Sequence, residues 1–241
     1  MKSDTKTVLK VVAATGLFAV VHTILASRKA KATATRLVGE RNRNAFYRPF
    51  YNAQATVTSG ALAYYIYKLP DKKLYQVNGP AAWAMQGLRL GFLVYGVAAA
   101  REIGFAGLTG WTGIKARLAG KPVVPPEPEA QGPSPAPDGR LNLGGPFRTS
   151  RHPLNFMGVP ILWLSPTMTL KLAVFNTLAT LYFWAGSLHE ARRLRAAYGE
   201  AYRDYENSNV PFFLPGRKKQ RRVQHHTEPL RTRSAATPVQ G

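Results

Sequence analysis

The sequence predicts an all-α, multi-pass membrane protein with about five transmembrane helices. The last two form a short helical hairpin, and an amphipathic interfacial helix follows them. Three observations predict this fold class: long apolar stretches, basic residues concentrated in alternate connections, and an amphipathic run near the C-terminus. The mean hydropathy is only -0.19. Polar tails and a polar middle loop lower that average, so individual windows are more informative than the mean.

The first apolar stretch, residues 8–26, is interrupted only by Lys10, His22 and hydroxyl side chains. A cleavable signal peptide is an alternative interpretation, because lysines precede the stretch and Ala26 is a possible cleavage position. The basic cluster that follows directly favours a helix that stays in the membrane.

The other predicted spans cover residues 50–69, 81–105, 154–167 and 169–188. The first of these is polar at its start and apolar later. Residues 154–167 are short, about 21 Å as a helix against a hydrocarbon core of about 30 Å, and Pro160 and Pro166 should bend or end the helix. The hairpin tip is therefore expected near Pro166.

Basic residues predict the orientation. Residues 27–48 carry seven Lys and Arg side chains against the single acid Glu40, so this loop should be cytoplasmic. We expect the protein in a bacterial inner membrane. On the outer side lie the N-terminus, residues 70–80 and the hairpin tip. On the cytoplasmic side lie residues 106–150 and the C-terminus. The net charge of +21 should attract anionic lipid headgroups on the basic face, at about 1 kcal/mol per nearby charge.

Composition excludes several functions. The chain has no cysteine, which rules out disulfides, a thiolate nucleophile and cysteine-ligated metals. Specific nucleic-acid binding is disfavoured, because the basic residues flank the spans and no stacking aromatics lie among them. No metal site is predicted, since Arg193 stands where a zinc-binding helix with the pattern His-Glu-x-x-His would need its second histidine.

Four regions are predicted from these patterns. Residues 1–117 form an N-terminal three-helix membrane region, residues 118–146 a proline- and glycine-rich cytoplasmic linker that is flexible or polyproline-like, residues 147–215 the helical hairpin with the interfacial helix and the candidate site, and residues 216–241 a basic disordered tail. The oligomeric state is not predicted.

Two polar clusters flank the hairpin. Gly144 to Pro153 combines glycines and prolines with Arg148, Arg151 and His152, which is typical of a binding loop. The hairpin brings the chain back to the same side, so Glu190 is expected near His152. There are two simpler alternatives. The loop could be a basic cluster at the membrane boundary followed by a helix-starting proline, and Glu190 could pair with a nearby arginine.

These clusters carry a resemblance. Gly-Pro-Phe, Arg-His-Pro, the apolar hairpin, Glu190, Tyr-Gly, Tyr-x-x-Tyr and Val-Pro-Phe-Phe-Leu-Pro resemble integral-membrane methyltransferases related to isoprenylcysteine carboxyl methyltransferase and phospholipid methyltransferases. His22, the basic loop, Phe46-Tyr47-Arg48 and Phe50-Tyr51-Asn52 resemble the NnrU-like branch and the methanethiol S-methyltransferases. The chain departs from the pattern at Asn155, at Ala191 and at Gly186, where the carboxyl methyltransferases have an arginine.

The resemblance implies an S-adenosylmethionine-dependent methyltransferase that acts on a small or lipophilic nucleophile such as a thiol or an amine. It implies catalytic roles for Arg151, His152 and Glu190. The implied cofactor-binding residues are Gly145, His152, Pro153, Glu190, Leu194, Tyr202 and Pro211.

Two other classes of function stay open. Some NnrU-like proteins are haem-dependent isomerases, for which His22 and His152 would be the candidate ligands, although a packing role suits His22 better. The other class is a non-catalytic membrane scaffold.

Overall fold

The computed structural model describes residues 3–124, 130–136 and 138–216. The predicted basic tail lies, apart from Gly216, outside the described residues. The fold is mostly helical. Five helices form its body, and they are α1 (Ser3–Ala26), α3 (Glu40–Lys68), α4 (Gly79–Ile103), α7 (Pro153–Trp163) and α8 (Leu170–Tyr198).

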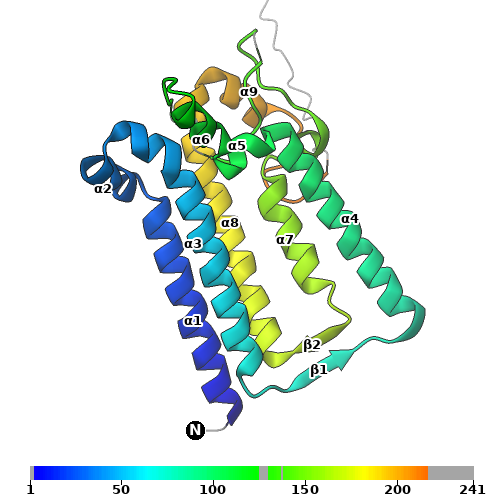
Figure 1. The fold of residues 1–241 in the computed structure, drawn as a ribbon. Helices are drawn as coiled ribbons and strands as arrows, with labels where there is room; N and C mark the ends of the chain where they lie inside the picture. The colour runs from blue at the N-terminus through cyan, green and yellow to red at the C-terminus, as the bar shows by residue number, and fades with distance from the viewer. Residues whose placement is uncertain (1–2, 125–129, 137, 217–241) are drawn as a thin grey trace, which may run out of the picture.

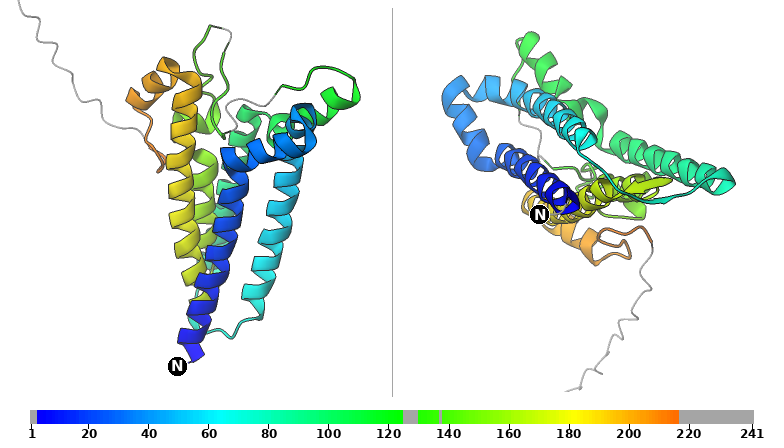
Figure 2. Two further views of the ribbon diagram at one scale, coloured as in Figure 1. Left: turned by 90° about the vertical axis from the view of Figure 1, so that its left-hand side faces the viewer. Right: turned by 90° about the horizontal axis from the view of Figure 1, so that it is seen from below.

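The five body helices alternate in direction, so that the chain passes from one end of the bundle to the other five times (Figure 1). Helix α1 packs between α3 and α8, and α7 packs between α8 and α4. Seen along its axis, the bundle is a curved layer rather than a closed ring (Figure 2). The predicted order of helices and turns along the chain is therefore present in the structure.

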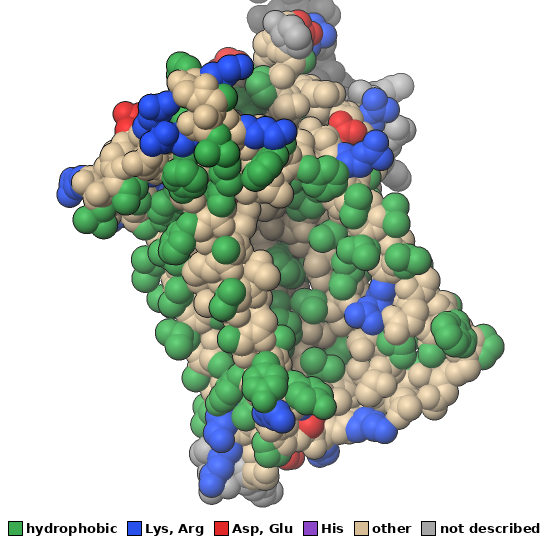
Figure 3. Space-filling view, viewed as in Figure 1, with side chains coloured by type: hydrophobic (Ala, Val, Ile, Leu, Met, Phe, Trp, Pro, Cys, Tyr) green, Lys and Arg blue, Asp and Glu red, His purple; other side chains and the backbone are tan. Residues whose placement is uncertain are grey.

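The body helices bury little of their apolar surface. A small core joins Val11 of α1 to Leu62, Ile66 and Leu69 around the end of α3. By contrast, Leu17 is 67% exposed and Trp83 is 79% exposed. Apolar side chains cover the middle of the molecule, and Lys and Arg gather towards its ends (Figure 3). Such a surface is typical of a membrane or protein interface.

Within the described residues, α1 is the one helix that is long and apolar enough to cross a membrane by length and composition. For three of the other body helices, local sequence features explain this. The first half of α3 is rich in Arg and Asn, α4 contains Arg89 and Arg101, and α7 has only 11 residues, about 16 Å. The predicted number of five spans remains a prediction.

The all-α prediction is incomplete at the end of the bundle near the N-terminus. Strand β1 (Lys73–Gln76) pairs in the antiparallel sense with β2 (Thr167–Thr169), and the pair joins the α3–α4 connection to the hairpin tip (Figure 1). All of β1 is exposed and shows no apolar alternation. Its pairing with a distant segment of the chain, rather than its own pattern, makes it a strand.

Short helices cover the opposite end of the bundle. They are α2 (Arg28–Val38), α5 (Phe105–Thr109), α6 (Trp111–Leu118), the 3-10 turn η1 (Gly145–Arg148) and α9 (Glu200–Asn207). The predicted single amphipathic helix is in fact two elements. Helix α8 continues to Tyr198, and Gly199, at φ 54°, turns the chain before α9 begins.

The described part of the proline-rich segment packs against the protein. Pro133 is fully buried, and Ala130, Leu141 and Leu143 pack on the cluster formed by the end of α8 and α9. A backbone hydrogen bond joins two parts of the segment, with Asn142 N donating to Ser134 O at 2.8 Å. Proline and glycine prevented helix formation without preventing burial. The four predicted region boundaries remain predictions.

Candidate functional site

Glu190, His152 and Asn155 meet at the end of the bundle that carries α9. The His152 Nδ1 lies 3.3 Å from Glu190 Oε2, and Asn155 Nδ2 donates to the same oxygen at 2.8 Å. Asn155 also donates to Ser187 Oγ at 3.0 Å, one turn before Glu190 on α8. The expected approach of Glu190 to His152 through the hairpin is therefore confirmed. Asn155, expected only as a departure from a family pattern, is a direct partner of the carboxylate.

The backbone before α7 fixes His152. Pro153 is the first residue of α7, a position that suits its fixed φ and missing N–H. Ser150 Oγ accepts from His152 N at 3.2 Å and donates to Phe213 O at 2.7 Å. Arg151 N donates to Pro211 O at 3.0 Å. The Val-Pro-Phe-Phe-Leu-Pro segment thus holds the Arg-His-Pro loop through backbone groups.

Arg151 points to a different carboxylate from His152. Its Nη1 lies 3.1 Å from Glu206 Oε1, and Arg195 forms two hydrogen bonds to Glu206, at 2.9 and 2.7 Å. The hydrogen bonds from Arg195 lower the pKa of Glu206. The turn at Gly199 redirects α9 and so brings Glu206 to Arg151.

A buried aromatic cluster lies behind this layer. Leu194 and Tyr202 have no exposed surface, and Tyr205 is 2% exposed. Tyr205 donates to Phe147 O at 2.6 Å, whereas burial raises the pKa of Tyr202 to about 12. The Tyr202 hydroxyl and His152 Nε2 are buried and have no hydrogen-bond partner among the described residues.

Gly145 lies apart from Glu190, against the end of α4. It adopts φ 46°, a left-handed conformation that favours glycine. At the preceding Gly144, an added Cβ would clash with the Glu102 carboxylate. The two glycines therefore allow the loop to approach Glu102 closely.

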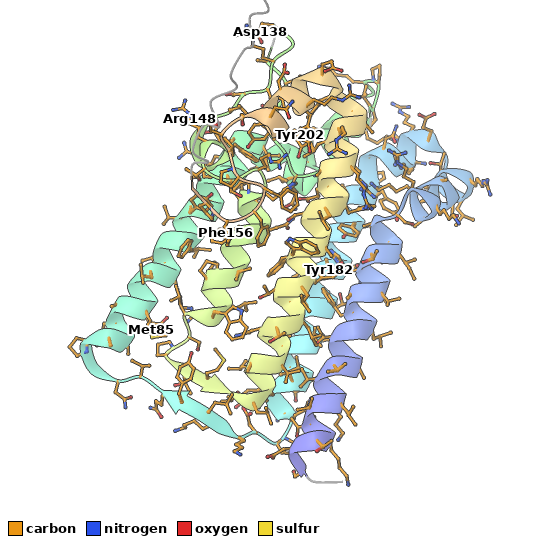
Figure 4. All side chains as sticks on the ribbon, turned by 180° about the vertical axis from the view of Figure 1, so that it is seen from behind. Met85, Asp138, Arg148, Phe156, Tyr182 and Tyr202 are labelled. Atoms are coloured by element: carbon orange, nitrogen blue, oxygen red, sulfur yellow. The ribbon has the colours of Figure 1, made fainter. Side chains whose placement is uncertain are left out.

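A cavity of about 810 Å³ opens between α1, α2, α3, α5 and α8. Glu190 lines it together with Asn155, Gly186 and His189, and Ala130 and Gln131 of the proline-rich segment form part of its wall. Of the predicted site residues, Glu190 is the one whose side chain lines the cavity; the others lie in the buried layer around it or at the Gly145 turn. Figure 4 shows Tyr202 at the α9 end of the bundle. Tyr182, which lines the cavity, lies nearer the middle of α8.

Comparison with known proteins gives two partial similarities. The chain is 32% identical over 83 residues to a methanethiol S-methyltransferase of Pseudomonas deceptionensis, covering 32% of this chain and 31% of that protein. It is 32% identical over 69 residues to the same enzyme of Crocosphaera subtropica, covering 29% and 27%. The matched part thus spans less than a third of each relative.

No family model matches the chain, and no solved structure matches it. The two similarities therefore support a protein that resembles membrane methyltransferases. They do not extend to a substrate.

Proposed function

We propose that the protein is an S-adenosylmethionine-dependent membrane methyltransferase that acts on a small or lipophilic nucleophile. The observation that carries the proposal is the Glu190 carboxylate. His152 and Asn155 hold it in place while it faces a cavity large enough for a cofactor and a small acceptor. The partial similarity to two methyltransferases supports the same reaction class.

The residues at this end of the bundle fit the cofactor. Glu190 can accept hydrogen bonds from the ribose hydroxyls or the amino group, because its side chain is 18% exposed and one of its oxygens is already oriented. The buried His152 Nε2 and Tyr202 hydroxyl, which have no partner among the described residues, are further polar atoms that a ligand could satisfy. Leu194, Pro153 and Pro211 would supply the apolar surroundings.

Methyl transfer from this cofactor does not require a general acid and a general base. The bound cofactor supplies an electrophilic methyl group, and transfer to a nucleophile is an in-line displacement. The contribution of the chain is then to hold the two reactants in line and to exclude water. In this view Glu190 binds the cofactor, and His152 and Asn155 hold the Glu190 side chain in position. Arg151 acts through Glu206 to hold α9 against the Arg-His-Pro loop.

We also propose that the protein spans a membrane. The five body helices would cross the bilayer, with α2 and α9 at the cytoplasmic face, where basic side chains meet anionic headgroups. Exposed apolar residues along the middle of the bundle support this placement.

Transfer of a labelled methyl group tests the proposed reaction. Membranes containing the full chain should convert methyl-labelled S-adenosylmethionine and methanethiol, the acceptor named for the two relatives, into a labelled thioether. Glu190→Gln keeps the size of the side chain but removes its charge. We expect it to lower kcat/KM by about 10- to 100-fold, the effect of losing a charged hydrogen bond.

The matched control is Glu200→Gln, because Glu200 is an exposed carboxylate of α9 that pairs with Arg203. It should transfer the label at the normal rate. Full activity in the Glu190 variant would remove Glu190 from the site, and no transfer by the unaltered protein to any thiol, amine or phenol would contradict the proposed reaction.

A further inference from the structure

The residues of α8 that line the cavity change in character along the helix. Those nearest α9 are ionisable and include His189, Glu190 and Arg192. Those one to two turns earlier are uncharged, namely Tyr182, Phe183, Ala185 and Gly186. Tyr182 precedes Glu190 by eight residues, about 12 Å along a helix, and lies nearer the middle of the bundle (Figure 4). The cavity therefore has an ionisable outer end, near Glu190, and an uncharged inner end, near Tyr182.

The two tyrosine hydroxyls of the inner end are paired with groups of α1. The Tyr51 hydroxyl lies 2.5 Å from His22 Nε2, and the Tyr182 hydroxyl lies 3.0 Å from Thr23 Oγ1. The rings of His22 and Tyr182 also meet edge to face, with 6.2 Å between centroids. Both hydroxyls are therefore satisfied within the protein, and the tyrosine rings remain as apolar surface for a ligand.

Gly186 leaves open space in the wall where the two ends of the cavity meet. An added Cβ at Gly186 would meet one atom within 4 Å, the Asn155 Nδ2 at 3.9 Å. At Gly158, by contrast, an added Cβ would clash with the ring of Phe183. Close helix packing thus accounts for Gly158 but not for Gly186. The neighbouring lining residues that are also small are Ala55 and Ala185.

The proposed cofactor suits the outer end better than the inner end. S-adenosylmethionine carries a carboxylate, an amino group and a sulfonium, and a charged group is costly to bury without polar partners. Glu190 and the other ionisable residues of the outer end can supply such partners. The inner end, with its aromatic rings and small side chains, suits an uncharged apolar group.

Resting on the proposed methyltransferase function, we propose that the inner end holds the body of the acceptor. This body is uncharged, apolar and about as large as an aromatic ring, and the acceptor atom that is methylated lies towards Asn155. Gly186 determines specificity, because it leaves the space through which the body passes. The two relatives are named for methanethiol, which has almost no apolar body. This chain should instead prefer acceptors with a ring.

Benzyl mercaptan and methanethiol are suitable probes, because they share the reacting group and differ in the ring. In both transfers a bond forms between the acceptor sulfur and the methyl carbon, and the thiol proton passes to solvent. The bond from that carbon to the sulfonium sulfur breaks, and its electron pair stays on the departing sulfur. We expect kcat/KM to be about 10- to 100-fold higher for benzyl mercaptan, the gain from burying an apolar group of side-chain size. Equal values would overturn the proposal.

Gly186→Leu tests the inner end, because leucine fills the open space and is a better helix former than glycine. Calorimetry on the full-length protein in detergent, saturated with S-adenosylhomocysteine, measures binding of benzyl mercaptan without any turnover. The Kd should rise by about 10- to 100-fold in the variant. In transfer, kcat/KM should fall by the same factor for benzyl mercaptan and stay unchanged for methanethiol.

Gly91→Leu is the matched control. Gly91 lies inside α4, an added Cβ there meets nothing within 4 Å, and it is not among the residues that line the cavity. This variant should behave as the unaltered protein with both thiols. An equal loss with benzyl mercaptan in both variants would overturn the role of Gly186.

Cofactor binding separates the two proposals. If the unaltered protein binds no S-adenosylmethionine, the proposed function fails and the acceptor site fails with it. If the cofactor binds but benzyl mercaptan does not, or if Gly186→Leu leaves its Kd unchanged, only the acceptor site is overturned. A loss of cofactor affinity in Gly186→Leu would also overturn it, because the space beside Asn155 would then belong to the cofactor.

Discussion

Two carboxylates at the α9 end of the bundle have different surroundings. Glu206 lies between the guanidinium groups of Arg151 and Arg195, so its charge is neutralised within the protein. Glu190 contacts the Asn155 amide and the His152 imidazole, and it faces the cavity. The first arrangement suits a structural ion pair, and the second suits a carboxylate with capacity left for a ligand.

Glu206→Gln should destabilise the protein without changing a residue of the proposed site. It leaves the 8% exposed Arg151 without its charged partner, which costs about 1–3 kcal/mol. The free energy of unfolding, measured by denaturation in detergent, should fall by that amount.

The pH dependence has a defined sign. The pKa of Glu206 is below its usual value of 4.5, so its stabilisation is complete above that value and is lost as the pH falls through the lowered pKa. Below about pH 4.5, the unaltered protein should therefore lose stability more steeply than the Glu206→Gln variant, which has no carboxylate to protonate at this position. Equal pH profiles of the two proteins would contradict the ion pair.

Helix packing in the hairpin depends on one small residue. At Gly158 of α7 an added Cβ would clash with the ring of Phe183 on α8, which also lines the cavity. Gly158→Ala should lower the free energy of unfolding by about 1–3 kcal/mol because it overpacks this contact. Thermal unfolding in detergent measures the effect.

The control is the same change at Gly91 of α4, where an added Cβ meets nothing within 4 Å. Gly91→Ala should stabilise the helix, by up to about 1 kcal/mol. If both variants behaved alike, the close packing of α7 on α8 would be wrong.

Helices were predictable where their signal is local. The apolar windows locate α1, α4 and the start of α8, and α7 ends at Trp163, shortly before Pro166. Strand β1 could not be found in this way, because it is four exposed residues whose structure depends on distant β2. The break at Gly199 was also missed, since the apolar spacing continues across it from Leu194 to Tyr205.

The candidate site was predictable in part for the same reason. The hairpin brings Glu190 to His152 by connectivity alone. Asn155 and Glu206 were missed as partners because their roles depend on side-chain geometry across elements. The packing of the proline-rich segment was missed because its composition indicates only that it is not helical. The close approach of Gly132 to Leu194, where an added Cβ would clash, is visible only in the structure.

At the scale of the whole molecule, the two ends of the bundle should lie on opposite sides of a membrane. The chain has no cysteine, so a single introduced cysteine can be labelled without background. In whole cells, a membrane-impermeant maleimide should label Lys73→Cys, on the exposed strand β1, and should not label Lys29→Cys, on α2. Inverted vesicles should give the reverse pattern.

Labelling of both positions from the same side would contradict the proposed five crossings. Labelling of Lys29→Cys in whole cells, with Lys73→Cys protected, would instead invert the bundle and place the site outside.

The proposed reaction depends most directly on cofactor binding at Glu190. Calorimetry of S-adenosylmethionine with the detergent-solubilised full chain should show saturable binding, competed by S-adenosylhomocysteine. Affinity should fall about 10- to 100-fold in Glu190→Gln and stay unchanged in Glu200→Gln. A folded protein that binds no S-adenosylmethionine, or a Glu190 variant that binds it normally, would contradict the proposed site.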